Sequence, residues 1–365
     1  MAGTRFGAVV SGRPFRAGSG LHPPGRKAGA AGRRKLTTDR MPEERYRVGK
    51  QKSGRRQTMS VQVKGSVGFL GLGVMGREMA RNLAVAGFAV KAYDVVPTAI
   101  EAMAGTGVTP AVTIAEATTD ADIVISMLPD TPQVEDVVRG KGGLLSNPPR
   151  GGLYVDMSTI APEATRILAA DLLKAGVRML DAPVSGGPVG ARDATLTIMV
   201  GGEAAAFERA RPFLQGMGTT INHVGASGAG QTVKLCNQLI CGINLQAICE
   251  AFALGRACDI DLVQMREVLM GGSASSWMLE KLGEAMIEGD TSAGFRIDLM
   301  MKDLRLVLGE AQQNLVPLPA TGLVASQYIA AQAHGEGANG NQALFRVYDR
   351  LTGRPTRRDA TASLA

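Results

Sequence analysis

A lysine and two amides share one face of a long apolar segment. Lys234, Asn237 and Gln238 are spaced i, i+3 and i+4, so a helix over residues 231–258 places them side by side. One interpretation is a solvated stripe on that helix. However, the flanking residues are mostly apolar, and a lysine buried among them is costly unless it serves a function. Near a nicotinamide, such a lysine can protonate a carbonyl oxygen as hydride arrives, while an amide orients its ammonium group.

A glycine-rich turn follows an apolar, strand-like run. Residues 71–76 read Gly-Leu-Gly-Val-Met-Gly, directly after Ser66–Leu70 and directly before a helix-like stretch. In this pattern the first glycine permits a tight turn, the second lets a pyrophosphate approach the backbone, and the third lets helix and strand pack closely. A second copy at residues 335–340 follows a helix-like stretch, so we interpret it as a loop. The first copy predicts dinucleotide binding.

The end of the next predicted strand indicates which cofactor is preferred. Ala89–Asp94 is apolar and ends in an acid about 20 residues past the glycines, where a carboxylate holds the ribose hydroxyls. The same carboxylate repels a 2′-phosphate. Val95 and Val96 follow, with no arginine to receive that phosphate. We therefore expect NAD(H) to be preferred over NADP(H).

Three predicted strands end in loops with unusual residues. Residues 126–129 contain a turn fixed by proline, residues 156–159 supply two hydroxyls, and residues 181–188 place a serine beside two glycines whose N–H groups can cradle a carboxylate. Each loop taken singly is more often a plain turn. Because the carboxyl ends of parallel strands form the ligand site of a nucleotide-binding sheet, their succession favours a binding role.

The elements that position these residues are of two types. From Lys64 to about Ala226 strand-like and helix-like segments alternate, which predicts a doubly wound, mostly parallel sheet; after Gly230 the pattern is helical throughout. The predicted fold class is an α/β Rossmann domain followed by an all-α domain, with the active site in the cleft between them. The predicted parts are a basic extension (1–62), a Rossmann domain (63–228), a helical domain (229–353) and a disordered tail (354–365). The predicted strands are 66–70, 89–94, 123–128, 153–156, 178–181, 195–200 and 221–224, and the later predicted helices are 231–258, 262–270, 276–288, 300–313, 321–333 and 341–351.

Composition is that of an ordinary globular protein, but the charge is uneven. The chain has 365 residues, 45% of them hydrophobic and 20% charged, and a net charge of +7. Residues 1–60 hold 15 of the 40 Lys and Arg but three of the 33 acidic residues, so the remainder has 25 basic and 30 acidic residues. No run approaches about 18 uninterrupted apolar residues, so no membrane span is expected.

The basic extension has no apolar periodicity and is expected to be disordered. Four interpretations compete: a nucleic-acid-binding arm, an organellar transit peptide, a twin-arginine export signal, and translation that starts at Met59 or Met41. The first lacks aromatic stacking residues and the third lacks a hydrophobic region. Residues 41–56 carry charges of both signs, which does not suit a transit peptide. The sequence therefore favours the later start.

Cysteines and histidines give no metal signature. All four cysteines lie between Cys236 and Cys258 without a C-x-x-C pair, which predicts small buried side chains in a reducing compartment. The three histidines are scattered along the chain, so neither a metal site nor a Ser-His-Asp triad is expected.

From about Val63 to Leu351 the chain resembles the β-hydroxyacid dehydrogenases, the family of 3-hydroxyisobutyrate dehydrogenase and tartronate semialdehyde reductase. The resemblance rests on the glycine-rich turn, the loop at residues 181–187, residues 230–238 and Lys302-Asp303-Leu304, in family order. It implies that Lys234 is the catalytic acid/base, with Asn237 and Gln238 beside it. It also implies substrate binding by Ser185, Gly186 and Gly187. Motif and resemblance together place these residues at the cofactor: Phe69, Leu70, Gly71, Leu72, Gly73, Val74, Met75, Gly76, Asp94, Met127, Leu128, Pro129, Thr159 and Lys302.

Within that family two substrates compete. Many relatives read Lys-x-x-Asn-Asn, whereas Gln238, together with Phe295–Leu299, looks more like tartronate semialdehyde reductase, which forms glycerate. The position of Trp277 resembles the hydroxyisobutyrate enzymes and supports the alternative, 3-hydroxyisobutyrate dehydrogenase.

Lys234 argues against two other classes of protein, a non-catalytic dinucleotide-binding homologue and an imine-reducing relative. The expected partners are a small hydroxy- or oxo-acid and further copies in a homodimer or homotetramer, without nucleic acid or membrane. The expected location is the cytoplasm, or mitochondria if residues 1–58 are a transit peptide.

Overall fold

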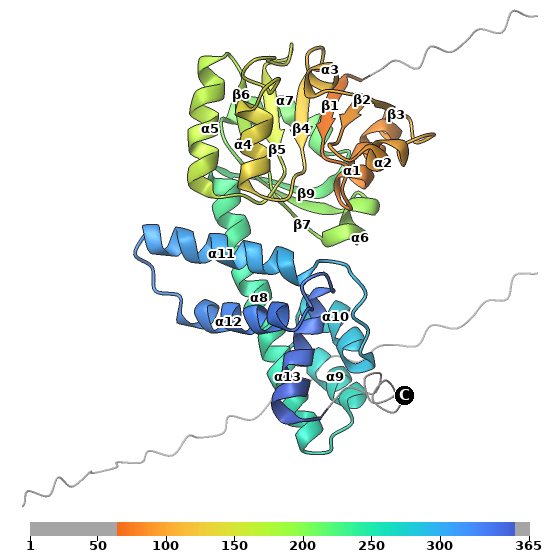
Figure 1. Cartoon of the computed structure of the whole chain (residues 1–365), viewed down its shortest axis with the longest axis vertical. Coiled ribbons are helices and arrows are strands. Elements are labelled where there is room, and N and C mark those ends of the chain that lie inside the picture. The colour runs from red at the N-terminus through yellow and green to blue at the C-terminus, as the bar shows by residue number, and fades with distance from the viewer. Residues whose placement is uncertain (1–63, 355–365) are drawn as a thin grey trace, which may run out of the picture. The chain divides into compact units, whose positions relative to one another are not determined.

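A computed structural model describes residues 64–354 of the chain. The predicted basic extension and the tail from residue 355 lie outside the described residues. Within residues 64–354, nine strands form one sheet in the order β3-β2-β1-β4-β5-β6-β8-β7, with β9 paired to β8 (Figure 1). The pairs from β3 to β6 are all parallel, while β8 runs antiparallel to β6 and β7. The strands are β1 (Ser66–Leu70), β2 (Ala89–Tyr93), β3 (Val108–Pro110), β4 (Ile123–Ser126), β5 (Leu153–Asp156), β6 (Arg178–Asp181), β7 (Val184–Ser185), β8 (Leu196–Gly201) and β9 (Gly218–Gly225).

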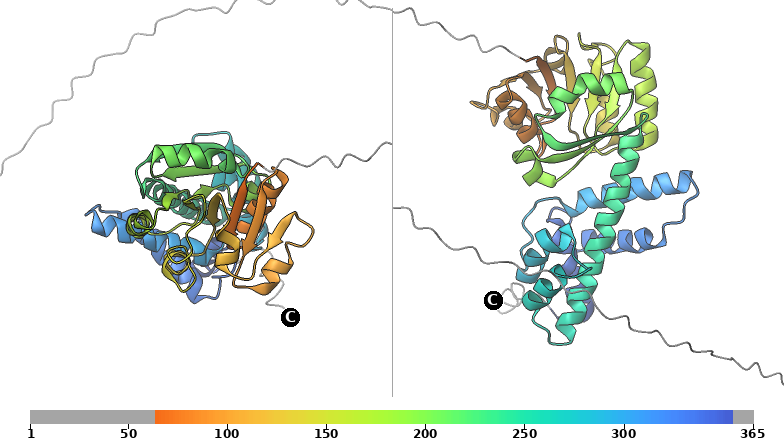
Figure 2. Two further views of the ribbon diagram at one scale, coloured as in Figure 1. Left: turned by 90° about the horizontal axis from the view of Figure 1, so that it is seen from above. Right: turned by 180° about the vertical axis from the view of Figure 1, so that it is seen from behind.

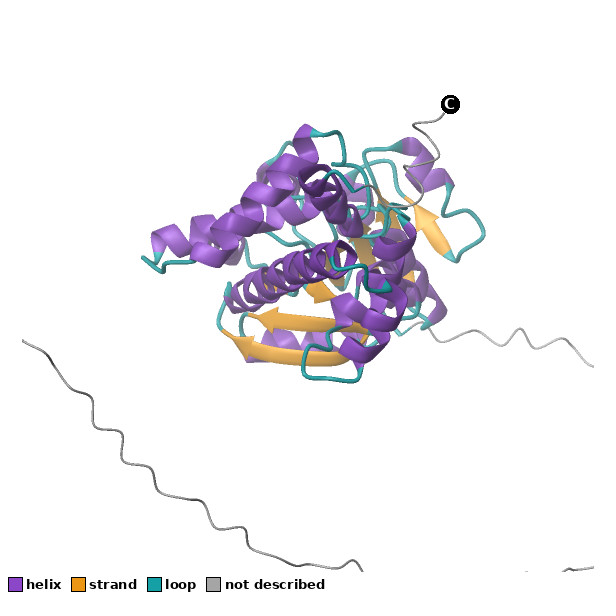
Figure 3. Cartoon of the chain, turned by 90° about the horizontal axis from the view of Figure 1, so that it is seen from below, coloured by secondary structure: helices purple, strands orange, loops and turns teal. Residues whose placement is uncertain are grey.

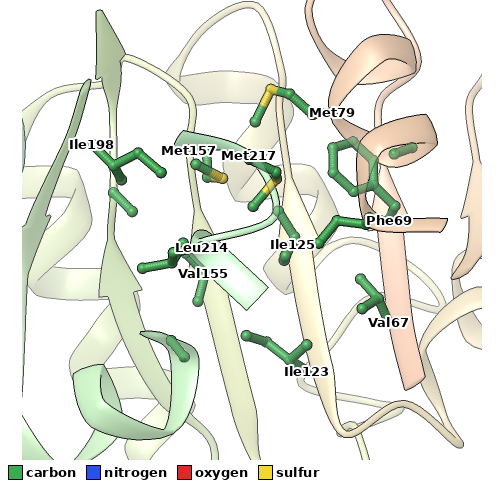
Figure 4. Close-up of a cluster of buried hydrophobic side chains, with 14 of the residues drawn as sticks. Val67, Phe69, Met79, Ile123, Ile125, Val155, Met157, Ile198, Leu214 and Met217 are labelled. Carbon is green, nitrogen blue, oxygen red and sulfur yellow. The ribbon is translucent and has the colours of Figure 1, made fainter. Parts of the chain in front are cut away.

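The central strands β1, β4 and β5 are buried on both faces because they are nearly continuous apolar runs, whereas β9 is largely exposed. Side chains such as Val67 and Phe69 of β1 enter one core with Met79 and Leu214, from helices on that face (Figure 4). Leu70, the next residue, points into a second core lined by helices α3, α4 and α5. The predicted Rossmann fold class is therefore confirmed. The covering helices are α1 (Gly76–Val85), α2 (Pro97–Glu101), α3 (Ile114–Thr118), α4 (Thr131–Arg139), α5 (Pro162–Lys174), α6 (Gly187–Arg192) and α7 (Ala204–Leu214).

Strand order reverses between β1 and β4, since the chain runs outward to β3 and then returns beside β1. Such a reversal opens a crevice at the carboxyl ends of the two strands, where ligands of doubly wound sheets bind. The predicted strand 123–128 ends at Ser126. Met127 N–H still bonds Leu70 O of β1, but Leu128 N–H bonds a serine side chain instead of the backbone of a neighbouring strand. Four elements were not predicted (β3, α3, β7 and α6), since each is too short to show a period.

All described strands, orange in Figure 3, precede Gly228, and only helices follow it. We propose this change as the domain boundary. The long helix α8 packs against α10–α13 around one apolar core (Figure 2). These elements are α8 (Ala229–Ala257), α9 (Leu262–Met270), α10 (Trp277–Glu288), α11 (Ile297–Gln313), α12 (Pro319–Ala333), the 3₁₀ turn η1 (Asn341–Leu344) and α13 (Phe345–Thr352).

The second glycine-rich motif is a loop, as predicted, and it fixes the start of α11. Ile297 N–H donates to Asn339 O and Asp298 N–H donates to Gly337 O, each at 3.0 Å. These long-range bonds explain why α11 begins three residues before the predicted start. The predicted helix 341–351 is divided between η1 and α13.

Helix α8 is the one described helix long and apolar enough to cross a membrane by length and composition, with a mean hydropathy of 1.3 in its most apolar window. Buried core helices pass the same test, and 44% of that window is buried inside the protein.

The prediction that all four cysteines are buried is wrong for two of them. Cys249 is buried and Cys241 half-buried, but Cys236 and Cys258 are exposed. Cys236 lies near exposed Val233 on the outer face of α8, and Cys258 is the residue that ends the helix.

Candidate active site

The glycine-rich turn between β1 and α1 has two packed glycines and one open one. A Cβ on Gly71 would lie 2.4 Å from Met127 O, and one on Gly76 would lie 1.9 Å from Gly71 O. Both positions therefore exclude any larger residue. In contrast, nothing lies within 4 Å of the position of a Cβ on Gly73. This is the free backbone that a pyrophosphate needs at the N-terminus of a helix.

Asp94 lies directly after β2 and contacts the turn. Its Oδ2 accepts a hydrogen bond from Leu72 N–H at 2.6 Å, and its Oδ1 accepts one from Val96 N–H at 2.8 Å. Each carboxylate oxygen retains a further lone pair, so the group can still accept ribose hydroxyls. From Tyr93 to Glu101 the chain has no lysine or arginine. The residues present fit a nicotinamide dinucleotide without a 2′-phosphate.

This arrangement predicts the effect of changing Asp94. Wild-type protein should have a higher kcat/KM with NADH than with NADPH, and Asp94→Ala should narrow the difference, because the repulsion of the 2′-phosphate is removed. Steady-state kinetics with both cofactors measures this. Equal or better kcat/KM of the wild type with NADPH would contradict it.

The other predicted cofactor residues differ in exposure. Phe69, Leu70 and Leu72 have side chains buried in the two cores, so only their backbone can contact a cofactor. The remaining positions fall into two groups: Val74 and Pro129 are exposed, and Met75, Met127, Leu128 and Thr159 are half-buried.

The polar face predicted on α8 forms a connected network. Lys234 Nζ donates to Gln238 Oε1 at 3.0 Å, and Asn237 Nδ2 donates to the same oxygen at 2.8 Å. Gln238 Nε2 then donates to Asp303 Oδ2 at 2.5 Å. Lys234 is 7% exposed, so the alternative of a solvated stripe is wrong for this lysine.

The surroundings of Lys234 act on its pKa in opposite directions. Burial lowers the pKa, and the nearby ammonium of Lys302 lowers it further, while the carboxylate of Asp303 and the thiol of Cys241 raise it. A lysine with a lowered pKa exchanges its proton more readily near neutral pH than an exposed one. The network can therefore deliver a proton to a carbonyl oxygen and take it back.

Lys302 connects α11 to the loop after β5. Its Nζ donates to Thr159 O at 2.7 Å and lies 2.8 Å from Asp303 Oδ1. The predicted cofactor residues Thr159 and Lys302 are thus in direct contact, and Asp303 links them to Gln238. Sequence reasoning noted Asp303 as part of a motif without assigning it to the site.

Two further residues hold α8 against the sheet, and the sequence analysis includes both only as parts of motifs, without this role. The Asp181 carboxylate accepts hydrogen bonds from Gly228 N–H at 2.8 Å and Gln231 N–H at 2.9 Å, at the start of the helix. The side chain of Gln231 donates to Ser158 O at 2.8 Å and accepts from Ile160 N–H at 3.2 Å. The signals available in the sequence were an acid at the end of a predicted strand and a glutamine three residues before Lys234.

The predicted substrate loop starts at Asp181 and lies at the sheet edge. Ser185 is half-buried on β7, opposite Thr197 of β8. Gly186 and Gly187 have φ values of +130° and +61°, which side-chain-bearing residues rarely adopt. Among the described contacts no hydrogen bond joins Ser185 to Lys234; Asp181 links the start of this loop to α8.

Within residues 64–354 no group of three or more His, Cys, Asp or Glu side chains is arranged to hold a metal ion.

Two family models match most of the described residues. Residues 66–225 match the NAD binding domain of 6-phosphogluconate dehydrogenase, and residues 228–348 match the NAD-binding domain of NADP-dependent 3-hydroxyisobutyrate dehydrogenase. The chain is 41% identical over 283 residues to 2-hydroxy-3-oxopropionate reductase of Escherichia coli, covering 78% of this chain and 97% of that protein. It is 39% identical over 295 residues to 3-hydroxyisobutyrate dehydrogenase of Pseudomonas aeruginosa, covering 78% and 99%.

A solved structure, that of 3-hydroxyisobutyrate dehydrogenase from Mycobacterium tuberculosis with L-serine, superposes with a TM-score of 0.71 at 34% identity, over 77% of this chain and 98% of that one. Fold, site and relatives together define an NAD-dependent oxidoreductase. The chain belongs to the β-hydroxyacid dehydrogenase family.

Proposed function

We propose that the protein reduces tartronate semialdehyde (2-hydroxy-3-oxopropanoate) to glycerate with NADH. The observation that carries this proposal is the buried hydrogen-bond network of Lys234, Gln238 and Asp303, in a sequence 41% identical to 2-hydroxy-3-oxopropionate reductase. Gln238 is also the residue that distinguishes this sequence from the Lys-x-x-Asn-Asn pattern of many relatives.

In this mechanism Lys234 Nζ protonates the aldehyde oxygen and, in the reverse direction, accepts the proton of the primary alcohol. NADH supplies the hydride that the carbonyl carbon receives. Gln238 holds the ammonium through its Oε1, and Asn237 donates to the same oxygen, so the lysine is kept in one orientation. Ser185, Gly186 and Gly187 bind the substrate, with the two glycine N–H groups directed to its carboxylate.

The glutamine of this network has a geometric consequence. An asparagine at position 238 would be one methylene shorter, so it would hold its amide closer to the backbone of α8 than Gln238, whose amide bonds Lys234 at 3.0 Å and Asp303 at 2.5 Å. The ammonium of Lys234 is therefore held by a longer side chain than in relatives with asparagine. We propose that this difference suits the substrate with a hydroxyl on the carbon next to the aldehyde.

The test is a substrate panel with purified full-length protein and NAD(H). We expect the highest kcat/KM for tartronate semialdehyde among the acids after which relatives are named, which include 3-hydroxyisobutyrate, L-serine and L-threonate. Oxidation of 3-hydroxyisobutyrate at a higher kcat/KM than glycerate would favour the alternative, 3-hydroxyisobutyrate dehydrogenase. That alternative is supported by the relative of 39% identity and by Trp277.

We also propose self-association through the helical half. Val233, Ile240 and Leu254 recur at multiples of seven residues on α8 and are 39%, 57% and 67% exposed. Spacing of this kind places them along one face of the helix. A homodimer or homotetramer would cover them.

A cytoplasmic location is likewise our proposal, and the mitochondrial alternative depends on residues outside the described range.

A further inference from the structure

Four buried polar residues join β4 to β5 where the two cofactor loops begin. Tyr154, Ser126, Asp156 and Ser158 each have 0% exposure. The Ser126 hydroxyl donates to Asp156 Oδ1 at 2.8 Å and lies 2.7 Å from the Tyr154 hydroxyl. Ser158 N–H donates to the same Oδ1 at 3.1 Å. Because the Ser126 proton is directed to Asp156, Tyr154 donates to Ser126, and the donors converge on one carboxylate oxygen.

The carboxylate also fixes the loop after β4. Ser158, which Asp156 holds, accepts a hydrogen bond from Leu128 N–H through its Oγ at 2.8 Å. Leu128 and Thr159, the residue after Ser158, are both among the positions proposed to line the cofactor. A single side chain therefore sets the relative position of both loops.

Asp156 lacks the basic partner and the full set of hydrogen bonds that buried carboxylates usually have. Its Oδ2 has no hydrogen-bond partner within residues 64–354, and no described lysine or arginine forms an ion pair with it. The titratable groups that act on it do not neutralise it: Asp181 of the neighbouring strand β6 has the same sign, and Tyr154 of its own strand β5 is kept protonated and neutral because burial raises its pKa. Lys302 of α11 instead bonds Thr159 O and Asp303. Departures of this kind are expected at functional sites.

We propose that Asp156 is a positioning residue that ties the Met127–Pro129 and Ser158–Ile160 loops together, and that its negative charge favours the oxidised cofactor over the reduced one. The nicotinamide ring of NAD⁺ carries a positive charge that the ring of NADH lacks. A carboxylate held next to the loops proposed to line the cofactor would stabilise the cationic form selectively. The inference rests on the proposed placement of the cofactor, and it is independent of the substrate.

The pH dependence follows from the burial of the carboxyl group. Burial raises the pKa of Asp156 to about 6, against the hydrogen bonds from Ser158 and Ser126 that lower it, and the charge of Asp181 raises it further. The group is therefore charged at pH 8 and neutral at pH 5. Its folded pKa lies above the value of 3.8 for an ordinary aspartate, so stability that is present at low pH is lost as the pH rises through about 6.

The experiment measures NAD⁺ and NADH dissociation constants of the full chain by calorimetry, at pH 8 and pH 5. Asp156→Asn should weaken NAD⁺ binding at pH 8 about tenfold relative to NADH binding, the usual scale of one neighbouring charge. Wild-type protein at pH 5 should show the same relative weakening of NAD⁺ binding, because Asp156 is then neutral. The matched control is Asp122→Asn, which removes a carboxylate at the opposite end of β4, paired with Arg150. Its cofactor ratio should equal that of the wild type.

An equal loss of affinity for both cofactors in Asp156→Asn, or a wild-type ratio that does not change with pH, would overturn the proposal. The variant Ser126→Ala tests the role of the Asp156 charge even if Asp156→Asn does not fold. It keeps the charge but removes one donor to the ionised form, so the pH midpoint of the NAD⁺ preference should move upward. Failure of wild-type protein to bind either cofactor would instead refute the cofactor site itself.

Discussion

Replacing Lys234 should abolish most of the catalysis while leaving the cofactor site intact. A positioned general acid contributes about 10²–10⁴-fold. We therefore expect Lys234→Met to lower kcat at least about 10²-fold, equivalent to about 2.7 kcal/mol of barrier. NADH affinity should change little, because the glycine turn and Asp94 belong to the sheet. Steady-state kinetics and NADH titration measure the two quantities separately.

Methionine is chosen because it keeps the methylene packing of a side chain that is 7% exposed. Burial lowers the pKa of Lys234, so the charged form is disfavoured in the fold and its removal should not reduce the melting temperature at neutral pH. Lys281→Met on α10 is the matched control, since that lysine is exposed and pairs with Glu280. A Lys234→Met protein with near-normal kcat would refute the mechanism.

The variant Lys234→Arg tests whether Lys234 also acts as the general base in the oxidation direction. A guanidinium remains protonated, so it cannot accept the alcohol proton in the oxidation direction. The variant should fail in glycerate oxidation even though its positive charge is retained. Retained oxidation would show that another group takes the proton.

The sequence predicts the local parts of this site well, because their geometry depends on short-range periodicity. The i, i+3, i+4 spacing of Lys234, Asn237 and Gln238 needs only a helix, and the structure joins the three side chains as expected. The glycine turn likewise depends on one strand and the helix that follows it. The boundary of α11 is different, since residues 337–339 fix its start from far along the chain.

The parts that sequence reasoning missed are contacts between distant segments. Gln238 and Asp303 are 65 residues apart and Lys302 and Thr159 are 143 apart, yet each pair is bonded directly. No periodicity within one segment specifies which face of α11 meets α8. Asp156 was noted only as the start of a loop, because its burial depends on strands on both of its sides.

Asp303 is the second residue whose loss should have a large effect, although it acts through other residues. It accepts the hydrogen bond from Gln238 Nε2 and faces the ammonium of Lys302, and it is 2% exposed. Asp303→Ala leaves the buried Gln238 amide without its acceptor, which costs about 1–3 kcal/mol. It also removes the counter-charge of Lys302, whose bond to Thr159 O remains. We expect a clear fall in melting temperature together with a fall in kcat of about 10-fold or more, since general-acid catalysis depends on position.

Asp303→Asn separates the charge from the hydrogen bond, because an amide oxygen still accepts from Gln238. The charge of Asp303 raises the pKa of Lys234, so its removal should lower that pKa further. Reduction requires protonated Lys234 and is lost as the pH rises through its pKa; the alkaline limb of the kcat–pH profile should therefore move to lower pH. Asp298→Asn, an exposed carboxylate on the same helix that accepts from Gln332, should leave the profile in place. An unchanged alkaline limb in Asp303→Asn would show that Asp303 supports the fold but does not tune the lysine.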